Sequence, residues 1–130
     1  MLNLPNTSAA LLVVTGSAVA SIAVHASFND LSIPSTTVIA GAQNTLIGAM
    51  GSTVVVASPP AAFDRNVKFL SVLNTSGSPC VVTIQQTDDG VLFLPLFSIT
   101  LLGGYAIHYS TDADGFVVYD TSGRRLLGSS

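Results

Sequence analysis

The chain has 130 residues, of which 48% are hydrophobic and only 8% are charged, and its formal net charge is −3. This length fits one domain with its own core, and the weak negative charge argues against binding nucleic acid through its phosphates. The chain has no Glu and a single Lys, Lys68, whereas helix surfaces are normally rich in Glu, Lys, Gln and Arg. Because Val, Thr, Ser and Ile dominate instead, the composition predicts an all-β fold.

The N-terminal segment combines an arm with two strand patterns. Residues 1–8 show no regular pattern, so we expect an irregular arm within residues 1–10. Residues 11–15 and 19–26 predict two strands around a tight hairpin at Gly16-Ser17.

The same segment has some features of a leader sequence. It is largely apolar, and residues 24–27 resemble a signal-peptidase site. However, no Lys or Arg precedes Arg65, and polar residues interrupt the apolar run. We therefore expect mature protein here, with no membrane-spanning helix.

The sequence pattern in the middle of the chain predicts a loop, an ambiguous segment and a strand. Residues 31–37, which include Pro34, predict a loop, and residues 44–50 fit either a short strand or an extended crossing segment. Residues 53–57 predict a strand that ends at Ser58-Pro59-Pro60, because proline cannot continue a ladder.

Short apolar runs separated by turn residues continue from Arg65 to Arg125. Strands are predicted over residues 67–73, 81–86, 91–102, 105–109 and 116–119. This spacing is typical of an antiparallel β-sandwich, of jelly-roll or Ig-like type. We expect it to span residues 11–123, with residues 124–130 as a C-terminal tail.

Candidate chemistry is sparse. His25 and His108 have no His, Cys or Glu at ligand spacing, so no metal site is predicted, and a hydrolase that works through Asp and His is the weakest functional alternative. Residues 112–115 contain only half of a calcium loop and predict a turn, as residues 88–90 do. Cys80 stands alone and is expected to pack as a small apolar side chain. No catalytic residue or cofactor is predicted.

Hydrophobicity points to an assembly. The mean hydropathy is +0.62, and so few charges provide little repulsion between copies. Residues 91–99 are apolar on both faces, which fits either a strand between core and partner or a central strand covered by a loop. We favour the partner and expect a homo-oligomeric subunit of a symmetric assembly.

Several segments together resemble a recurrent small protein of tailed-phage and prophage structural gene clusters. They are residues 65–68, 74–77, 82–90, 100–105 and 115–124, with residues 14–19 and 24–28 near the N-terminus. The likeness is one of strand and turn patterns and covers most of the chain, although the hydrophobic run 93–99 departs from the pattern. It implies a β-sandwich virion component: a capsid decoration or cement protein, a head fibre or a small tail part.

The resemblance implies a non-enzymatic subunit that is made in the host cytoplasm and binds the major capsid protein, copies of itself, or both, on the capsid surface. The expected partner contacts are Leu2, Leu4, Phe93, Phe97, Arg124 and Arg125. The alternative is a tail-associated or head-fibre component with a receptor- or glycan-binding role, for which Tyr105, Tyr109 and Tyr119 offer stacking faces.

Overall fold

The structure is a computed structural model that describes residues 2–16, 21–32, 37–111 and 115–128. Within these ranges the chain forms strands and no helix, which confirms the prediction of an all-β fold. The strands are β1 (Leu2–Leu4), β2 (Ala10–Thr15), β3 (Ile22–Ser32), β4 (Val38–Ile47), β5 (Gly51–Val56), β6 (Phe63–Asn74), β7 (Cys80–Thr87), β8 (Phe93–Leu101), β9 (Ala106–Ser110), β10 (Gly115–Tyr119) and β11 (Arg125–Gly128).

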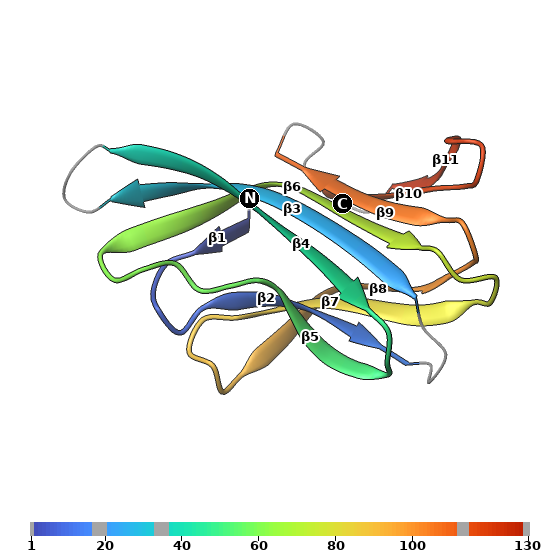
Figure 1. Ribbon diagram of the computed structural model, residues 1–130, viewed down its shortest axis with the longest axis horizontal. Coiled ribbons are helices and arrows are strands. Elements are labelled where there is room, and N and C mark those ends of the chain that lie inside the picture. Colours follow the sequence, from blue (N-terminus) through green and yellow to red (C-terminus); the bar gives the residue numbers. More distant parts are fainter. Residues whose placement is uncertain (1, 17–20, 33–36, 112–114, 129–130) are drawn as a thin grey trace.

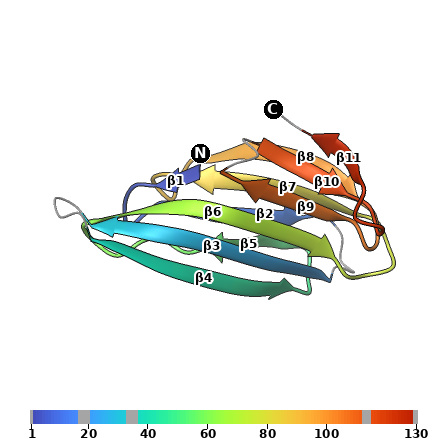
Figure 2. The same ribbon diagram turned by 90° about the horizontal axis from the view of Figure 1, so that it is seen from above.

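Two antiparallel sheets pack face to face (Figures 1 and 2). Sheet A has seven strands in the order β11-β10-β9-β6-β3-β4, and its seventh strand, β1, also pairs with β6. Sheet B has four strands in the order β5-β2-β7-β8. The predicted antiparallel β-sandwich is therefore confirmed, and β5 and β8 are the edge strands of sheet B.

The core lies between the sheets and uses alternate residues of each strand, because successive side chains of a strand point to opposite faces. In sheet A, every second side chain of a strand therefore points toward the core, and the side chains between them lie on the outer face. Cys80 lies in the core, as its strand pattern predicts. Other large, fully buried members are Leu4, Leu11, Ile22, Leu70, Ile84, Leu101 and Ile107.

Part of the expected irregular arm belongs to the sandwich: Leu2–Leu4 form a strand, whereas residues 5–9 lie outside the strands. Leu2–Leu4 form β1, which pairs with the N-terminal part of β6, from Arg65 to Val67. The backbone N–H of Leu2 donates to the Tyr109 hydroxyl at 3.0 Å. Leu2 and Leu4 are buried in this chain's own core, so they do not form the expected contact surface. Alternate leucines of a strand reach the same face, where burial removes their apolar area from water.

One further segment settles an open alternative, and another differs from the prediction. The segment that fitted either a strand or a crossing segment forms the end of β4, which pairs with β3 along its whole length. Small residues in the middle of β4 (Ala40, Gly41 and Ala42) hide the strand signal in the sequence. The expected tail contains β11, which pairs with β10 at the edge of sheet A. Residues 17–20, 33–36 and 112–114, on which the predicted hairpin, loop and turn fall, lie outside the described residues. Leu31 and Ser32, which were expected in the loop, belong to β3.

Candidate functional site

The most prominent apolar surface is a continuous strip at the start of β8. We call residues 91–96 the β8 strip. Val91 is 82% exposed, Leu92 62% and Leu94 55%, and Phe93 and Leu96 are also exposed. β8 is an edge strand, so its side chains have a neighbouring strand, β7, on one side only. A contiguous exposed apolar patch of this kind marks an interaction site more often than a random feature of the surface.

The turn before the β8 strip is held by its own hydrogen bonds. Asp89 Oδ1 accepts from the backbone N–H of Val91 at 2.8 Å and of Leu92 at 2.9 Å. These two bonds favour the carboxylate and keep the pKa of Asp89 below its usual value. Gly90 has a φ of 78°, which suits glycine, and its N–H donates to Thr87 Oγ1 at 2.8 Å. The turn therefore presents Val91 and Leu92 in a defined conformation.

The two phenylalanines of the predicted contact have different environments. Phe93 belongs to the exposed β8 strip. Phe97 is only partly buried, but it packs against the core and stacks on Phe116 of sheet A, with ring centroids 5.3 Å apart and planes 13° from parallel. Phe97 thus joins the two sheets, and Phe93 is the one available to a partner.

The arginines of the predicted contact lie on the other sheet. Arg124 is exposed, and its Nε is 3.9 Å from Asp120 Oδ2. Arg125 is exposed and begins β11, opposite Tyr119. Of the six expected contact residues, two therefore lie in the core, two in β8 and two next to or in β11.

A row of rings crosses the outer face of sheet A. His25 of β3, Phe69 of β6, His108 of β9 and Tyr119 of β10 follow one another, with centroid separations of 6.3, 5.4 and 5.0 Å. In each pair the two residues are diagonal neighbours across the ladder, because the directly paired residue lies two positions away. The row thus follows from strand register and is invisible in the linear sequence.

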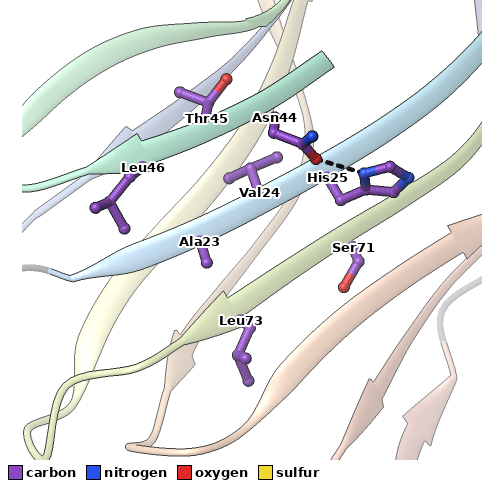
Figure 3. A pocket seen from close by; sticks show the side chains of 8 residues that line it. All are labelled: Ala23, Val24, His25, Asn44, Thr45, Leu46, Ser71 and Leu73. Atoms are coloured by element: carbon purple, nitrogen blue, oxygen red, sulfur yellow. Dashed lines mark hydrogen bonds between the residues drawn. The ribbon is translucent and has the colours of Figure 1, made fainter. Parts of the chain in front are cut away.

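Beside the row lies a hollow of about 500 Å³ between β4, β3 and β6 (Figure 3). We call it the outer-face hollow. Its lining residues are Ala23, Val24, His25, Asn44, Thr45, Leu46, Ser71 and Leu73. His25 Nδ1 and Asn44 Oδ1 are hydrogen-bonded at 2.5 Å, which sets the orientation of the imidazole ring. The imidazole ring of His25 therefore lines the outer-face hollow in an orientation that its hydrogen bond to Asn44 fixes.

The three tyrosines that the sequence offers as stacking faces are not equivalent. Tyr109 is buried, and its ring lies 5.3 Å from that of Phe116. Tyr105 packs against the core. Tyr119 belongs to the ring row, so it is the one of the three placed with other rings on the outer face of sheet A.

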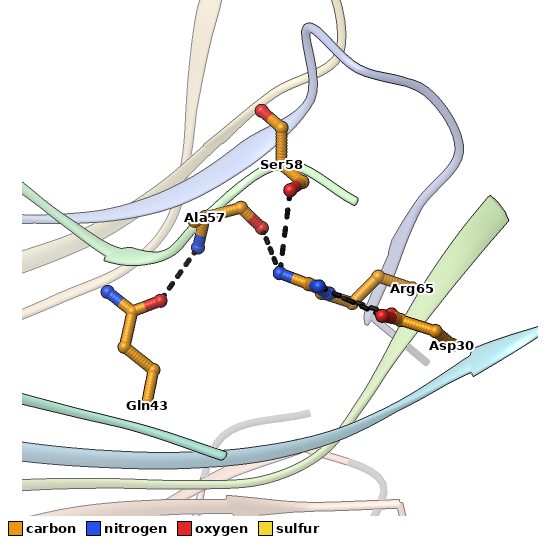
Figure 4. Close-up of polar contacts among 5 residues, drawn as sticks. All are labelled: Asp30, Gln43, Ala57, Ser58 and Arg65. Atoms are coloured by element: carbon orange, nitrogen blue, oxygen red, sulfur yellow. Dashed lines mark hydrogen bonds and ion pairs between the residues drawn. The ribbon is translucent and has the colours of Figure 1, made fainter. Parts of the chain in front are cut away.

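A buried ion pair between Asp30 of β3 and Arg65 of β6 also contacts the segment after β5 (Figure 4). Arg65 Nε and Nη2 donate to Asp30 at 2.8 and 2.9 Å. Arg65 Nη1 donates to the Ala57 carbonyl at 2.8 Å, and the guanidinium carbon lies 3.9 Å from the centroid of the Phe28 ring. The N–H of Ala57 in turn donates to Gln43 Oε1 at 3.0 Å.

The Asp30–Arg65 ion pair was not predicted, although the sequence contains a signal for it. Asp30 continues the inward alternation of Phe28 in β3, and Arg65 shares the inward face of β6 with Val67. Charged residues at inward positions of an otherwise apolar strand are rare unless they are paired. Their positions imply a structural role, since the guanidinium is surrounded by residues of the same chain.

The described residues contain no group of three His, Cys, Asp or Glu side chains that could hold a metal ion. In the same part of the chain, neither histidine forms a hydrogen bond with an aspartate. No described helix has the length and hydropathy needed to span a membrane. Comparisons with protein-family models, curated proteins and solved structures found no match for this chain.

The stability of the protein should fall as the solution becomes acidic, in part through His108. Burial between neighbouring rings lowers the pKa of His108 below its usual 6.5, so the folded state binds this proton less readily than the unfolded state. The contribution of His108 to the free energy of unfolding is therefore present above pH 6.5 and is lost as the pH falls toward the pKa of the folded state. For one proton the slope cannot exceed about 1.4 kcal/mol per pH unit.

The measurement is urea denaturation of the protein and of His108→Phe across this pH range. The difference between the two unfolding free energies should be constant above pH 6.5 and should change below it. A constant difference at every pH would contradict the assignment to His108.

Proposed function

We propose that this protein is a non-enzymatic virion structural subunit that binds the major capsid protein on the shell surface and stabilises the shell. The observation that carries the proposal is the β8 strip, an uncharged apolar surface on an edge strand. The proposal also follows the resemblance of the strand and turn patterns in the sequence to those of small structural proteins of tailed phages and prophages. The low charge of the chain supports an assembled state as well.

The edge of β8 favours contact through side chains over the addition of a further strand. Pro95 has no N–H to donate, and the register with β7 shifts between Ile84 and Gln85, so that the ladder skips Leu96. Proline and bulges on an edge strand discourage open-ended pairing with other chains. The strip can therefore bind an apolar surface of a partner with a lower risk of fibre formation.

Repetition gives such contacts their strength. Fully burying one Val or Leu side chain is worth about 1.5–3 kcal/mol, so five apolar side chains give at most about 8–15 kcal/mol. The loss of translational and rotational freedom on association costs about 4–15 kcal/mol, so a single contact is modest. A shell repeats that contact at every symmetry-related position. A subunit that touches two neighbouring shell proteins links them, and many such links raise the resistance of the shell to internal pressure.

The test is reconstitution with shells that lack the protein. Purified wild-type protein should bind them and raise the temperature at which they break. Leu94→Asp places a charge in the middle of the β8 strip and should weaken binding at least tenfold, about 1.4 kcal/mol, because the carboxylate would be desolvated in the contact.

Val38→Asp is the matched control, because Val38 is similarly exposed but lies on β4, at the edge of the other sheet. It should bind like the wild type. Equal binding of both variants would remove the β8 strip from the proposal, and microscopy that finds the protein only at the tail would reject the cement role.

A second role is favoured by the ring row on the outer face of sheet A. A tail-associated or head-fibre component that binds a receptor or glycan can use neighbouring aromatic rings, and the row contains four rings, inclined to one another by 48°, 65° and 50°. Host adsorption separates the roles, because particles that lack a cement protein should adsorb normally. If the double variant His25→Gln, His108→Gln retains virion function, the hydrolase alternative is dismissed.

A further inference from the structure

The outer-face hollow is built by strand register from two parallel rows of side chains. Ala23 of β3 pairs with Leu46 of β4 on one side and with Leu73 of β6 on the other. Two residues further along β3, His25 pairs with Asn44 of β4 and with Ser71 of β6. The hollow therefore has an apolar row beside a polar row, as Figure 3 shows.

The small side chain of Ala23 creates the space. Leu46 lies on β4 and Leu73 on β6, and β3 runs between these two strands, so their backbones are about 10 Å apart. Ala23 of β3 forms the floor of the hollow between the two leucines. The volume of about 500 Å³ lies within the range of small-molecule sites, and Leu46 is 73% exposed, so the apolar wall is accessible.

The chemistry of the lining selects the kind of ligand. None of the eight lining residues is Asp, Lys or Arg, so nothing compensates a charged ligand. The polar row offers an imidazole, an amide and a hydroxyl, which together can both donate and accept hydrogen bonds. A molecule with an apolar face and neutral hydroxyls along its edge matches both rows, and a pyranose ring has this form.

We propose that the outer-face hollow binds one pyranose ring of a neutral glycan. The C–H face of the sugar lies on Ala23 between Leu46 and Leu73, and its hydroxyls meet His25, Asn44 and Ser71. The ring row leads away from His25 through Phe69 to His108, so that adjoining sugars of the same glycan meet further aromatic rings. This inference rests on the second proposed role and is independent of the β8 strip.

The experiment is a titration of ¹⁵N-labelled full-length protein with neutral methyl pyranosides and neutral disaccharides, followed through backbone amide shifts. At least one sugar should shift the amides of Ala23, His25 and Leu46, with a dissociation constant on the order of a millimolar. Ala23→Leu fills the floor and should weaken this binding at least tenfold. Leu46→Ala removes one wall from an exposed position without disturbing the core, and should weaken it at least threefold.

Ala40→Leu is the matched control, since Ala40 is an exposed alanine of β4 on the same face but outside the hollow. It should bind sugar like the wild type. The inference is overturned if no sugar shifts these amides at tens of millimolar, if the shifts lie elsewhere, or if Ala23→Leu binds normally. Should adsorption depend on the protein while no sugar binds, the inference fails and the second role stands.

Discussion

Replacing Arg65 with methionine should lower the free energy of unfolding by about 3 kcal/mol or more. The substitution keeps an apolar stem of similar length but leaves the Asp30 carboxylate inside the sandwich without its two hydrogen bonds. It also removes the bond to the Ala57 carbonyl and the contact with the Phe28 ring. Urea denaturation followed by circular dichroism measures the loss.

Arg124→Met is the control for this prediction. Arg124 is 80% exposed and sits 3.9 Å from its acidic neighbour, so its removal should change stability by less than about 0.5 kcal/mol. The double variant Asp30→Leu, Arg65→Met should recover part of the loss, because it leaves no unpaired charge. Equal stabilities of Arg65→Met and Arg124→Met would show that the Asp30–Arg65 ion pair contributes little to the free energy of unfolding.

Replacing Leu4 with alanine should cost about 3 kcal/mol, an effect of similar size. Leu4 is fully buried and belongs to β1, which pairs with β6 beside Tyr109. The loss combines the transfer free energy of the missing methyl groups with that of the cavity they leave. The midpoint of thermal or urea unfolding measures it, and an irregular exposed arm would give no change.

Leu92→Ala provides the comparison, because it deletes the same atoms from a side chain that is 62% exposed. Its effect on stability should stay within about 0.5 kcal/mol. If Leu4→Ala were as mild as Leu92→Ala, β1 would not contribute to the core of the folded protein in solution.

Much of the fold follows from local signals. Strands β6, β7, β9 and β10 were predicted within a few residues, because each combines period-two alternation with Gly, Asn or Asp at its ends. β4 was only partly predicted, since three consecutive small residues remove the contrast between its two faces. β1 and β11 were missed because short strands carry too few residues to show a period, and their pairing with β6 and β10 depends on distant segments.

The candidate sites were harder to predict. Phe93 was identified as a contact residue from the apolar run around it, and it is exposed. Phe97 came from the same run but packs on Phe116, which lies about twenty residues further along the chain. No local feature separates the two, because the difference depends on which part of β8 faces the other sheet.

The amino-acid sequence by itself determined that this chain is all-β, poor in charge, free of internal disulfides, and rich in strands that must bury one face. Those properties depend on composition and on the alternation of neighbouring residues, which act over a few positions. The tertiary structure alone decided that β8 is an edge, that Leu2 and Leu4 are core, and that Asp30 meets Arg65. It likewise assembled the ring row and the outer-face hollow, because register joins residues that the chain keeps far apart.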